Sequence, residues 1–332
     1  MNLYCCYKLC TFALIIFDFS CNFKSMLIKK YLYIAAVSVS QFACSAGGEG
    51  GEVVPSEPSN PAQPTERMPI DISTSITRAT ETAFESGDQI GLFVVNRNAD
   101  GTSTALQTSG NHVDNMLYTF STVWTPAAPV YWKDTKTCAD FYMYYPYRKS
   151  VASVSAMPFD VAADQSAVAA YKASDLLVGS KLNVVPSKQA VDIVAKHVMS
   201  QVEIVLKAGN GFTDASIAAS KVTLRLNNLK TSSSVNLSTA VATATGTTSS
   251  LTPYKDGGVY RAIVVPQEVA MCNLITVTID GTDYSLAKAF TFVAGKRHTF
   301  SVTLAKTGSG VNVTIGAWDV DDTDNGGTAT DE

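Results

Sequence analysis

Cys44 is the residue whose type and position predict a definite chemistry, the attachment of a lipid to a thiol. It follows two lysines and an uncharged apolar run from Tyr31 to Ala43. A positive start, a short apolar run and a small residue before the cut are typical of a secretion signal. The run is well below the ~20 residues that a membrane-spanning helix needs. Residues 1–44 are therefore predicted to be a bacterial lipoprotein signal, with palmitate or a similar acyl chain on Cys44.

Two features of this region leave alternatives open. The three residues before the cysteine are Gln41, Phe42 and Ala43, and a glutamine at that distance is unusual for a lipoprotein. Plain secretion and an uncleaved anchor are the alternatives. Residues 1–25 do not fit a signal, so translation is predicted to start at Met26.

The remaining residues suited to catalysis or metal binding are few. The histidines are His112, predicted in a surface turn, and His197 and His298, predicted to cap strands or lie at the edge of a core. Cys138 and Cys272 are predicted to be small buried hydrophobes, with a disulfide between them as the alternative. The sequence contains no nucleophile elbow, phosphate loop or zinc-protease helix motif. We therefore predict no enzyme activity, no catalytic residue, no metal and no cofactor.

The acidic end, Asp319 to Gly327, resembles a calcium loop only superficially. Counting from Asp322, the fifth position is Gly326, where the loop requires an oxygen ligand. Residues 321–332 are therefore predicted to be a solvated acidic tail.

A cluster of aromatic residues suggests either a carbohydrate platform or core packing. Its members are Trp124, Tyr131, Trp132, Phe141, Tyr142, Tyr144, Tyr145 and Tyr147. Core packing is preferred because these residues lie on predicted strands. Tyr142 and Tyr144 are the members expected to be exposed.

The elements that must position these residues are short strands. Val202, Ile204 and Leu206 alternate with polar residues, and Asn, Asp and Gly turns separate many such runs. Charged residues make up 16% of the chain and the net charge is -4, which excludes an electrostatic case for nucleic acid. The pattern predicts an all-β protein made of antiparallel β-sandwiches. A Gly- and Pro-rich linker at 45–68 is followed by an N-terminal sandwich at 69–195 and a C-terminal sandwich at 196–320.

Nine motifs in a fixed order resemble the fimbrillin family of Bacteroides-type bacteria. They are Thr77-Arg-Ala79, Phe84-Glu-Ser-Gly-Asp-Gln-Ile-Gly-Leu-Phe93, Pro129-Val-Tyr-Trp132, Ala139-Asp-Phe-Tyr-Met-Tyr-Tyr-Pro146, Asp175-Leu-Leu-Val-Gly179, His197-Val-Met-Ser-Gln-Val202, Tyr260-Arg-Ala-Ile-Val-Val-Pro-Gln267, Phe292-Val-Ala-Gly-Lys-Arg-His-Thr-Phe300 and Ile315-Gly-Ala-Trp318.

The resemblance implies two tandem transthyretin-like β-sandwich domains and a structural subunit of a cell-surface fimbria. It also implies a lipidated precursor at the outer membrane that a trypsin-like protease cuts between Arg78 and Ala79. Removal of the strand before the cut leaves a groove that a strand of the next subunit fills. The implied partners are other fimbrial subunits, the outer membrane through Cys44, and a host or bacterial surface ligand for adhesion.

Two alternatives to this function stay open. A donor strand at the C-terminal end would have to come from the segment with Val311, Val313, Ile315 and Trp318. Because the tail beyond it is poor in apolar residues, the chain is either a repeating subunit or a tip or anchor subunit that is not cleaved. The alternative of another class is a monomeric surface lipoprotein that binds a glycan through exposed aromatic residues.

Overall fold

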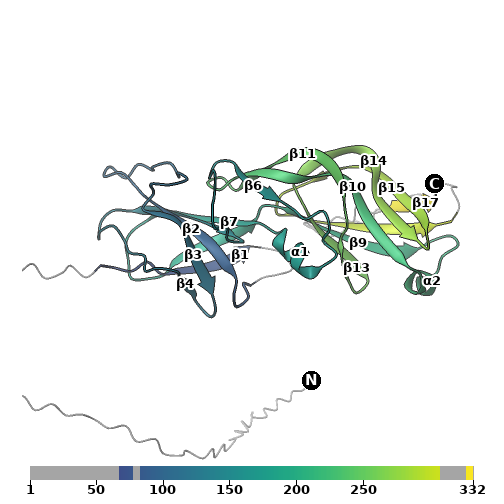
Figure 1. Cartoon of the computed structure of the whole chain (residues 1–332), viewed down its shortest axis with the longest axis horizontal. Helices are drawn as coiled ribbons and strands as arrows, with labels where there is room; N and C mark the ends of the chain where they lie inside the picture. Colours follow the sequence, from purple (N-terminus) through teal and green to yellow (C-terminus); the bar gives the residue numbers. More distant parts are fainter. Residues whose placement is uncertain (1–66, 78–82, 307–326, 332) are drawn as a thin grey trace, which may run out of the picture. The chain divides into compact units, whose positions relative to one another are not determined.

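The computed structural model describes residues 67–77, 83–306 and 327–331 (Figure 1). These described residues belong to one compact unit. Nearly all regular structure in the described residues is strand, which confirms the all-β prediction.

The first sheet has seven strands in the order β1-β8-β7-β5-β2-β3-β4. Its strands are β1 (Ile72–Thr77), β2 (Gln89–Asn96), β3 (Val113–Phe120), β4 (Trp124–Pro126), β5 (Ala139–Tyr145), β7 (Leu177–Val184) and β8 (Val191–His197).

The second sheet has ten strands, nine of them in the order β11-β10-β14-β15-β17-β16-β9-β13-β12, with β6 beside β10. Its strands are β6 (Met157–Asp160), β9 (Ser200–Ala208), β10 (Val222–Asn236), β11 (Val241–Leu251), β12 (Tyr254–Asp256), β13 (Val259–Val264), β14 (Gln267–Ile279), β15 (Thr282–Phe292), β16 (Arg297–Ala305) and β17 (Gly327–Asp331).

Most neighbouring strands are antiparallel, as predicted, but three described pairs are parallel. These are β1 with β8, β9 with β16, and β16 with β17. Parallel neighbours need a long connection between them, and Ile72 lies opposite Val191 after more than a hundred intervening residues. Alternation along one strand carries no information about such distant partners. Two sheets are consistent with β-sandwich packing, and the tandem transthyretin-like arrangement stays a prediction.

Two short helices connect strands. They are α1 (Val168–Ala173) and α2 (Asp214–Ala219). A capping box precedes α2: the Thr213 hydroxyl accepts from the Ser216 backbone N–H, and the Ser216 hydroxyl accepts from the Thr213 backbone N–H. This reciprocal pair satisfies two donors at the start of the helix.

The described residues have two hydrophobic cores. The first core lies within the first sheet and includes Ile90, Phe141 and Ile193, all with an exposed fraction of 0%. The second core combines residues before 197, such as Phe93 and Phe159, with many residues of the second sheet. Strand β6 also crosses the predicted domain boundary. Met157–Asp160 precedes this boundary but pairs with β10 of the second sheet (Figure 1). The boundary between 195 and 196 stays a prediction, although β8 ends at His197 and β9 begins at Ser200.

The expected exposure of two aromatic residues was wrong. Tyr142 is 8% exposed and Tyr144 is 0% exposed, and both belong to the second core. Strand β5 is buried along six of its seven residues, so both of its faces pack against apolar side chains. The glycan platform therefore loses the residues on which it depended.

The expected solvated tail was also wrong for the part that the structure describes. Gly327–Asp331 forms β17, which pairs with Val302–Ala305 of β16 and with Tyr284 and Ser285 of β15. A strand between two others is held by main-chain hydrogen bonds on both sides. The prediction rested on the failed calcium-loop pattern, which carries no information about pairing through main-chain groups.

Gly91 of β2 is required by the ring of Tyr144, its cross-strand partner on β5. A Cβ atom at Gly91 would lie 2.3 Å from Tyr144 Cε1 and 2.6 Å from Asn115 Oδ1. The ring cannot move easily, because it is buried and its hydroxyl donates to Asn115 Oδ1 at 2.8 Å.

We expect Gly91→Ala to lower the free energy of unfolding by about 1–3 kcal/mol, the usual cost of overpacking. Gly258→Ala is the matched control, since no atom lies within 4 Å of a Cβ there. Urea denaturation of both variants measures the difference. Equal stability of the two variants would show that the Tyr144 ring is free to move.

Candidate functional site

Residues Arg67–Thr77, here called the N-terminal arm, lie along an edge of the first sheet and end directly before Arg78. Main-chain hydrogen bonds hold its first part: Ile70 N donates to Val130 O and Trp132 N donates to Met68 O, both at 2.9 Å. The Arg67 guanidinium carbon lies 4.6 Å from the centre of the Tyr131 ring. The stretch with Tyr131 and Trp132, expected to be a strand, is joined to the arm through an isolated bridge.

The second part of the arm is β1, whose single strand partner among the described residues is β8. The pairing is parallel and runs from Ile72 opposite Val191 to Thr77 opposite Lys196. The side chain of Ser73 adds a hydrogen bond to Asp192 Oδ1 at 3.2 Å. An edge strand has hydrogen bonds along one side only, so β1 can leave without separating any other pair of strands.

The arm covers the first core. Ile70 is 2% exposed and Ile72 is 5% exposed, and Ile76 packs on the same cluster. The Trp124 indole, 7% exposed, donates from Nε1 to the Thr74 hydroxyl at 2.8 Å. Loss of the arm would therefore open a groove over the first core.

The groove contains two buried donors with no hydrogen-bond partner among the described residues, the Tyr118 hydroxyl and Trp132 Nε1. Burial raises the pKa of Tyr118, and the nearby Asp71 carboxylate of the arm raises it further. Buried donors without partners cost free energy.

The chain after the arm has an anchor of its own. The ring of Phe84 lies 5.0 Å from that of Trp124, 5.6 Å from that of Tyr145 and 6.3 Å from that of Phe120, measured between centres. The anchor shares Trp124 with the arm, but its contacts with Tyr145 and Phe120 involve no residue of the arm. A cut between Thr77 and Phe84 would free the arm and leave the rest in place.

The residues predicted to carry lipidation, cleavage and strand donation lie outside the described residues. They are Cys44, Arg78, Ala79, Val311, Val313, Ile315 and Trp318. The structure does place their neighbours: β1 ends at Thr77, the described chain resumes at Ala83, and β16 ends at Ala305.

The sequence did not identify β8 as the partner of the arm. The alternation of Val191, Ile193 and Ala195, all buried, is the signal that could have found it. These residues lie at the predicted boundary between domains, where no strand was expected. The sequence analysis did not identify Tyr118 and Trp132 as buried hydrogen-bond donors. No sequence pattern indicates that a donor will lack an acceptor.

The cysteines and histidines form no catalytic arrangement within the described residues. Cys138 and Cys272 are free thiols and half-buried, so the disulfide alternative is excluded in this structure. His112, expected at the surface, is half-buried with Nε2 2.7 Å from Tyr131 O. His197 Nδ1 lies 2.9 Å from Asp175 Oδ1, and His298 Nε2 accepts from Val293 N at 3.1 Å. Burial, then the charge of Lys296, lowers the pKa of His298.

Two other kinds of feature are absent from residues 67–77, 83–306 and 327–331. No cluster of three or more metal-ligating side chains occurs there. Within the same ranges, none of the helices has the length and apolar character required to cross a membrane.

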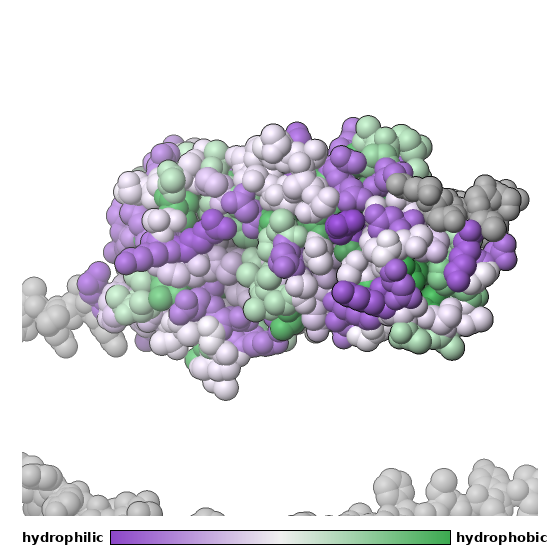
Figure 2. Space-filling model, turned by 45° about the vertical axis from the view of Figure 1, so that its right-hand side comes forward, coloured by the Kyte–Doolittle hydropathy of each residue, from purple (hydrophilic) through white to green (hydrophobic). Residues whose placement is uncertain are grey.

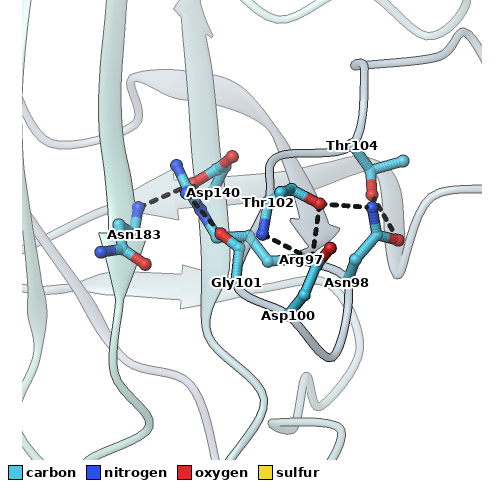
Figure 3. A network of polar contacts seen from close by, with 8 residues as sticks. All are labelled: Arg97, Asn98, Asp100, Gly101, Thr102, Thr104, Asp140 and Asn183. Atoms are coloured by element: carbon cyan, nitrogen blue, oxygen red, sulfur yellow. Dashed lines mark hydrogen bonds and ion pairs between the residues drawn. The ribbon is translucent and has the colours of Figure 1, made fainter.

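A polar network joins the ends of β2, β5 and β7 (Figure 3). Asp140, 0% exposed, accepts at Oδ1 from Arg97 Nε at 2.8 Å and from Asn183 N at 2.7 Å. Arg97 Nη1 also donates to Gly101 O at 3.0 Å, which fixes the following loop. Asp100 in that loop accepts from Thr102. These contacts connect three strands and a loop, which is a structural role.

Several known proteins are similar to this chain in sequence or in structure. A protein of Bacteroides uniformis named "Putative fimbrium subunit Fim1C" is 28% identical over 276 residues, which cover 77% of this chain and 87% of that protein. Two crystal structures share the fold, each described as a "putative cell adhesion protein". The one from Bacteroides uniformis has a TM-score of 0.57 and 24% identity and covers 74% of this chain and 95% of that one. The one from Bacteroides ovatus has a TM-score of 0.58 and 18% identity and covers 71% and 92%.

A family model also matches most of the chain. The model described as fimbrillin-like matches residues 77–318, which is more than half of the chain and includes strands of both sheets. This chain therefore belongs to the fimbrillin-like family.

Proposed function

We propose that this protein is a structural subunit of a cell-surface fimbria that assembles by proteolysis and strand exchange. In this proposal the precursor is exported as a lipoprotein, with acyl chains on Cys44 that hold it at the outer membrane. Cleavage after Arg78 then removes the arm together with the lipid, and the subunit joins other fimbrial subunits and contributes to adhesion. One observation supports the proposal above all: the arm covers a core, and its second part, β1, is an edge strand with one strand neighbour among the described residues that ends directly before Arg78.

Loss of the arm would leave the protein with a strong tendency to bind another strand. The main-chain groups of β8 that pair with β1 would lose their partners, and the core beneath Ile70 and Ile72 would meet water. An unpaired edge readily accepts a strand of another chain. Main-chain hydrogen bonds would supply affinity in such a pairing, and alternate side chains would fill the pockets left by the isoleucines.

The proposed donor is the segment with Val311, Val313, Ile315 and Trp318. Three of these residues alternate and would face one side of an extended strand. Their spacing resembles that of Ile70, Ile72 and Ile76 in the arm, which supports an exchange of one for the other. The match to the fimbrillin-like family begins at Thr77, beside the proposed cut, and ends at Trp318.

The test is Arg78→Ala in the exported protein, with Arg67→Ala as the control that removes an arginine from the same arm. We expect Arg78→Ala to keep the lipid and the arm and to form no fibres, while Arg67→Ala assembles normally. Intact mass of the mature protein reports lipid and cleavage together, and electron microscopy reports fibres.

Fibres of normal length from Arg78→Ala would contradict cleavage as the trigger. If the unmodified protein itself keeps the lipid and the arm within fibres, its role is that of an anchor subunit.

A further inference from the structure

Most strand edges in the described part of the chain are protected against pairing with another molecule. β4 has three residues and includes Pro126. β12 also has three residues, of which Lys255 and Asp256 are charged. β6 includes Pro158, whose carbonyl accepts from Arg148 Nη1 at 3.1 Å. Short length, proline and charge are the usual means of protecting an edge, and the edge at β1 belongs to the site described above.

Strand β11 is the exception among these edges. It ends the second sheet, with β10 as its single strand neighbour among the described residues. Residues 163–165 cover the C-terminal end of β11. Thr252 N donates to Ala163 O and Gln165 N donates to Thr252 O, both at 2.8 Å. A bulge around Gly246, where φ is +76°, interrupts the pairing with β10 in the middle. Among the described residues, these two features leave the outer side of Val241–Thr245, here called the free edge, without protection (β11 is labelled in Figure 1).

The side chains of the free edge favour contact with another strand. The segment contains no charge and no proline. Val241 is 57% exposed, and Thr243 is exposed on the same face. On the other face Ala242 and Ala244 pack against the second core but stay partly open to solvent. A strand placed beside β11 would extend the sheet and cover these two alanines.

The surface that the described residues form in Figure 2 has no broad apolar face that would bind a partner. On the side shown in Figure 2, hydrophobic residues form small patches among hydrophilic ones. Recognition through main-chain groups at an edge therefore fits this surface better than recognition through a large apolar area.

We infer that the free edge pairs with the free edge of a second copy of this chain, antiparallel and across a two-fold axis at Thr243. This register places Thr243 opposite Thr243, Ala242 opposite Ala244, and Val241 opposite Thr245. Small residues then meet small residues on the core face, and β-branched residues meet on the outer face, which is a favourable cross-strand pairing. No like charges face each other, so the segment is complementary to itself, as a two-fold interface requires.

The pairing is weak and concentration-dependent, because five residues from each chain bury far less than the ~1,200 Å² of a stable interface. It needs neither cleavage at Arg78 nor a change at the arm. It is therefore separate from strand exchange, and either can hold without the other.

The test measures self-association of the exported full-length protein by sedimentation over a range of concentrations. The unmodified protein is expected to form a reversible dimer. Thr243→Lys places two ammonium groups opposite each other at the axis, and we expect at least about tenfold weaker association. Thr247→Lys adds the same charge to an exposed residue in the bulge of the same strand and is expected to dimerise normally. Thermal melting of both variants checks that they are folded.

A second measurement reports the register directly. After treatment with an oxidant, Thr243→Cys is expected to form a disulfide-linked dimer, because residues opposite each other at the axis have Cβ atoms ~5 Å apart. Thr247→Cys, which contains the same other cysteines, is expected to stay largely monomeric. The inference is overturned if the unmodified protein is monomeric at all concentrations, if both lysine variants dissociate equally, or if Thr243→Cys does not cross-link above the level of Thr247→Cys.

Discussion

Replacing Ile70 and Ile72 together with alanine is expected to lower the free energy of unfolding by about 4 kcal/mol or more. Each side chain is almost fully buried in the first core, with exposed fractions of 2% and 5%. Truncation of a buried isoleucine to alanine typically costs about 2–5 kcal/mol, since apolar surface and packing are lost together. The two residues belong to the same strand face, so the second change acts on a cavity that the first has opened, and the effects need not add. Thermal or urea denaturation of the double variant measures the loss.

Ser75→Ala is the control for this experiment, because Ser75 lies on the opposite, exposed face of β1. Its effect is expected to stay within about 0.5 kcal/mol, as for most surface substitutions. If the double isoleucine variant were as stable as Ser75→Ala, the arm would not hold the first core closed. The proposed groove would then lose its physical basis.

Asp140→Ala is expected to lower the free energy of unfolding by about 3–5 kcal/mol, the usual cost of breaking a buried pair by removing one partner. The Asp140 side chain is 1% exposed, whereas the Arg97 side chain is 16% exposed. Without the carboxylate, Arg97 keeps its bond to Gly101 O but has no counter-charge, and Asn183 N loses its acceptor. The residue Asn183 adopts a positive φ of 56°, so this acceptor also supports an unusual backbone conformation.

Two further variants separate charge from shape in this network. Asp140→Asn keeps an acceptor oxygen and is expected to fall between Asp140→Ala and the unmodified protein. Asp100→Ala removes an exposed carboxylate that accepts from Thr102 alone among the described residues, and its effect is expected to be smaller than either. A loss from Asp100→Ala as large as that from Asp140→Ala would show that the loop, and not the buried carboxylate, stabilises this region.

The sequence predicted those strands in which one face is apolar and the other polar. The alternating residues of β9 and of β16, with Ile204 and Phe300 buried, are examples. It missed β11, where Thr, Ser and Ala give no contrast between faces, and β17, which is held by main-chain groups. A strand that is buried on both faces led to the opposite error, because residues predicted to be exposed are buried. On β5 the residues on either side of Met143 were expected at the surface, but a second core covers them.

The candidate site could be predicted only in part for a related reason. The isoleucines of the arm and the neighbouring Arg78 are visible in the sequence. The partner β8 lies more than a hundred residues away, and pairing at that distance leaves no local pattern. The groove donors Tyr118 and Trp132 could not be recognised either, because a missing hydrogen-bond partner exists only in three dimensions.

The position of β6 has a consequence for the order in which the chain folds. Met157–Asp160 completes its pairing only with Ser232–Val235, and Phe159 packs in a core whose other walls come mostly from residues after 197. In the export that we propose for this chain, the first 200 residues would emerge without these partners. Contacts at such sequence distances form slowly, because the chain between them must close a long loop first. The N-terminal part is thus expected to stay incompletely packed until the C-terminal part has crossed the membrane. If the chain is exported as proposed, this delay is expected to keep the precursor unfolded during transport.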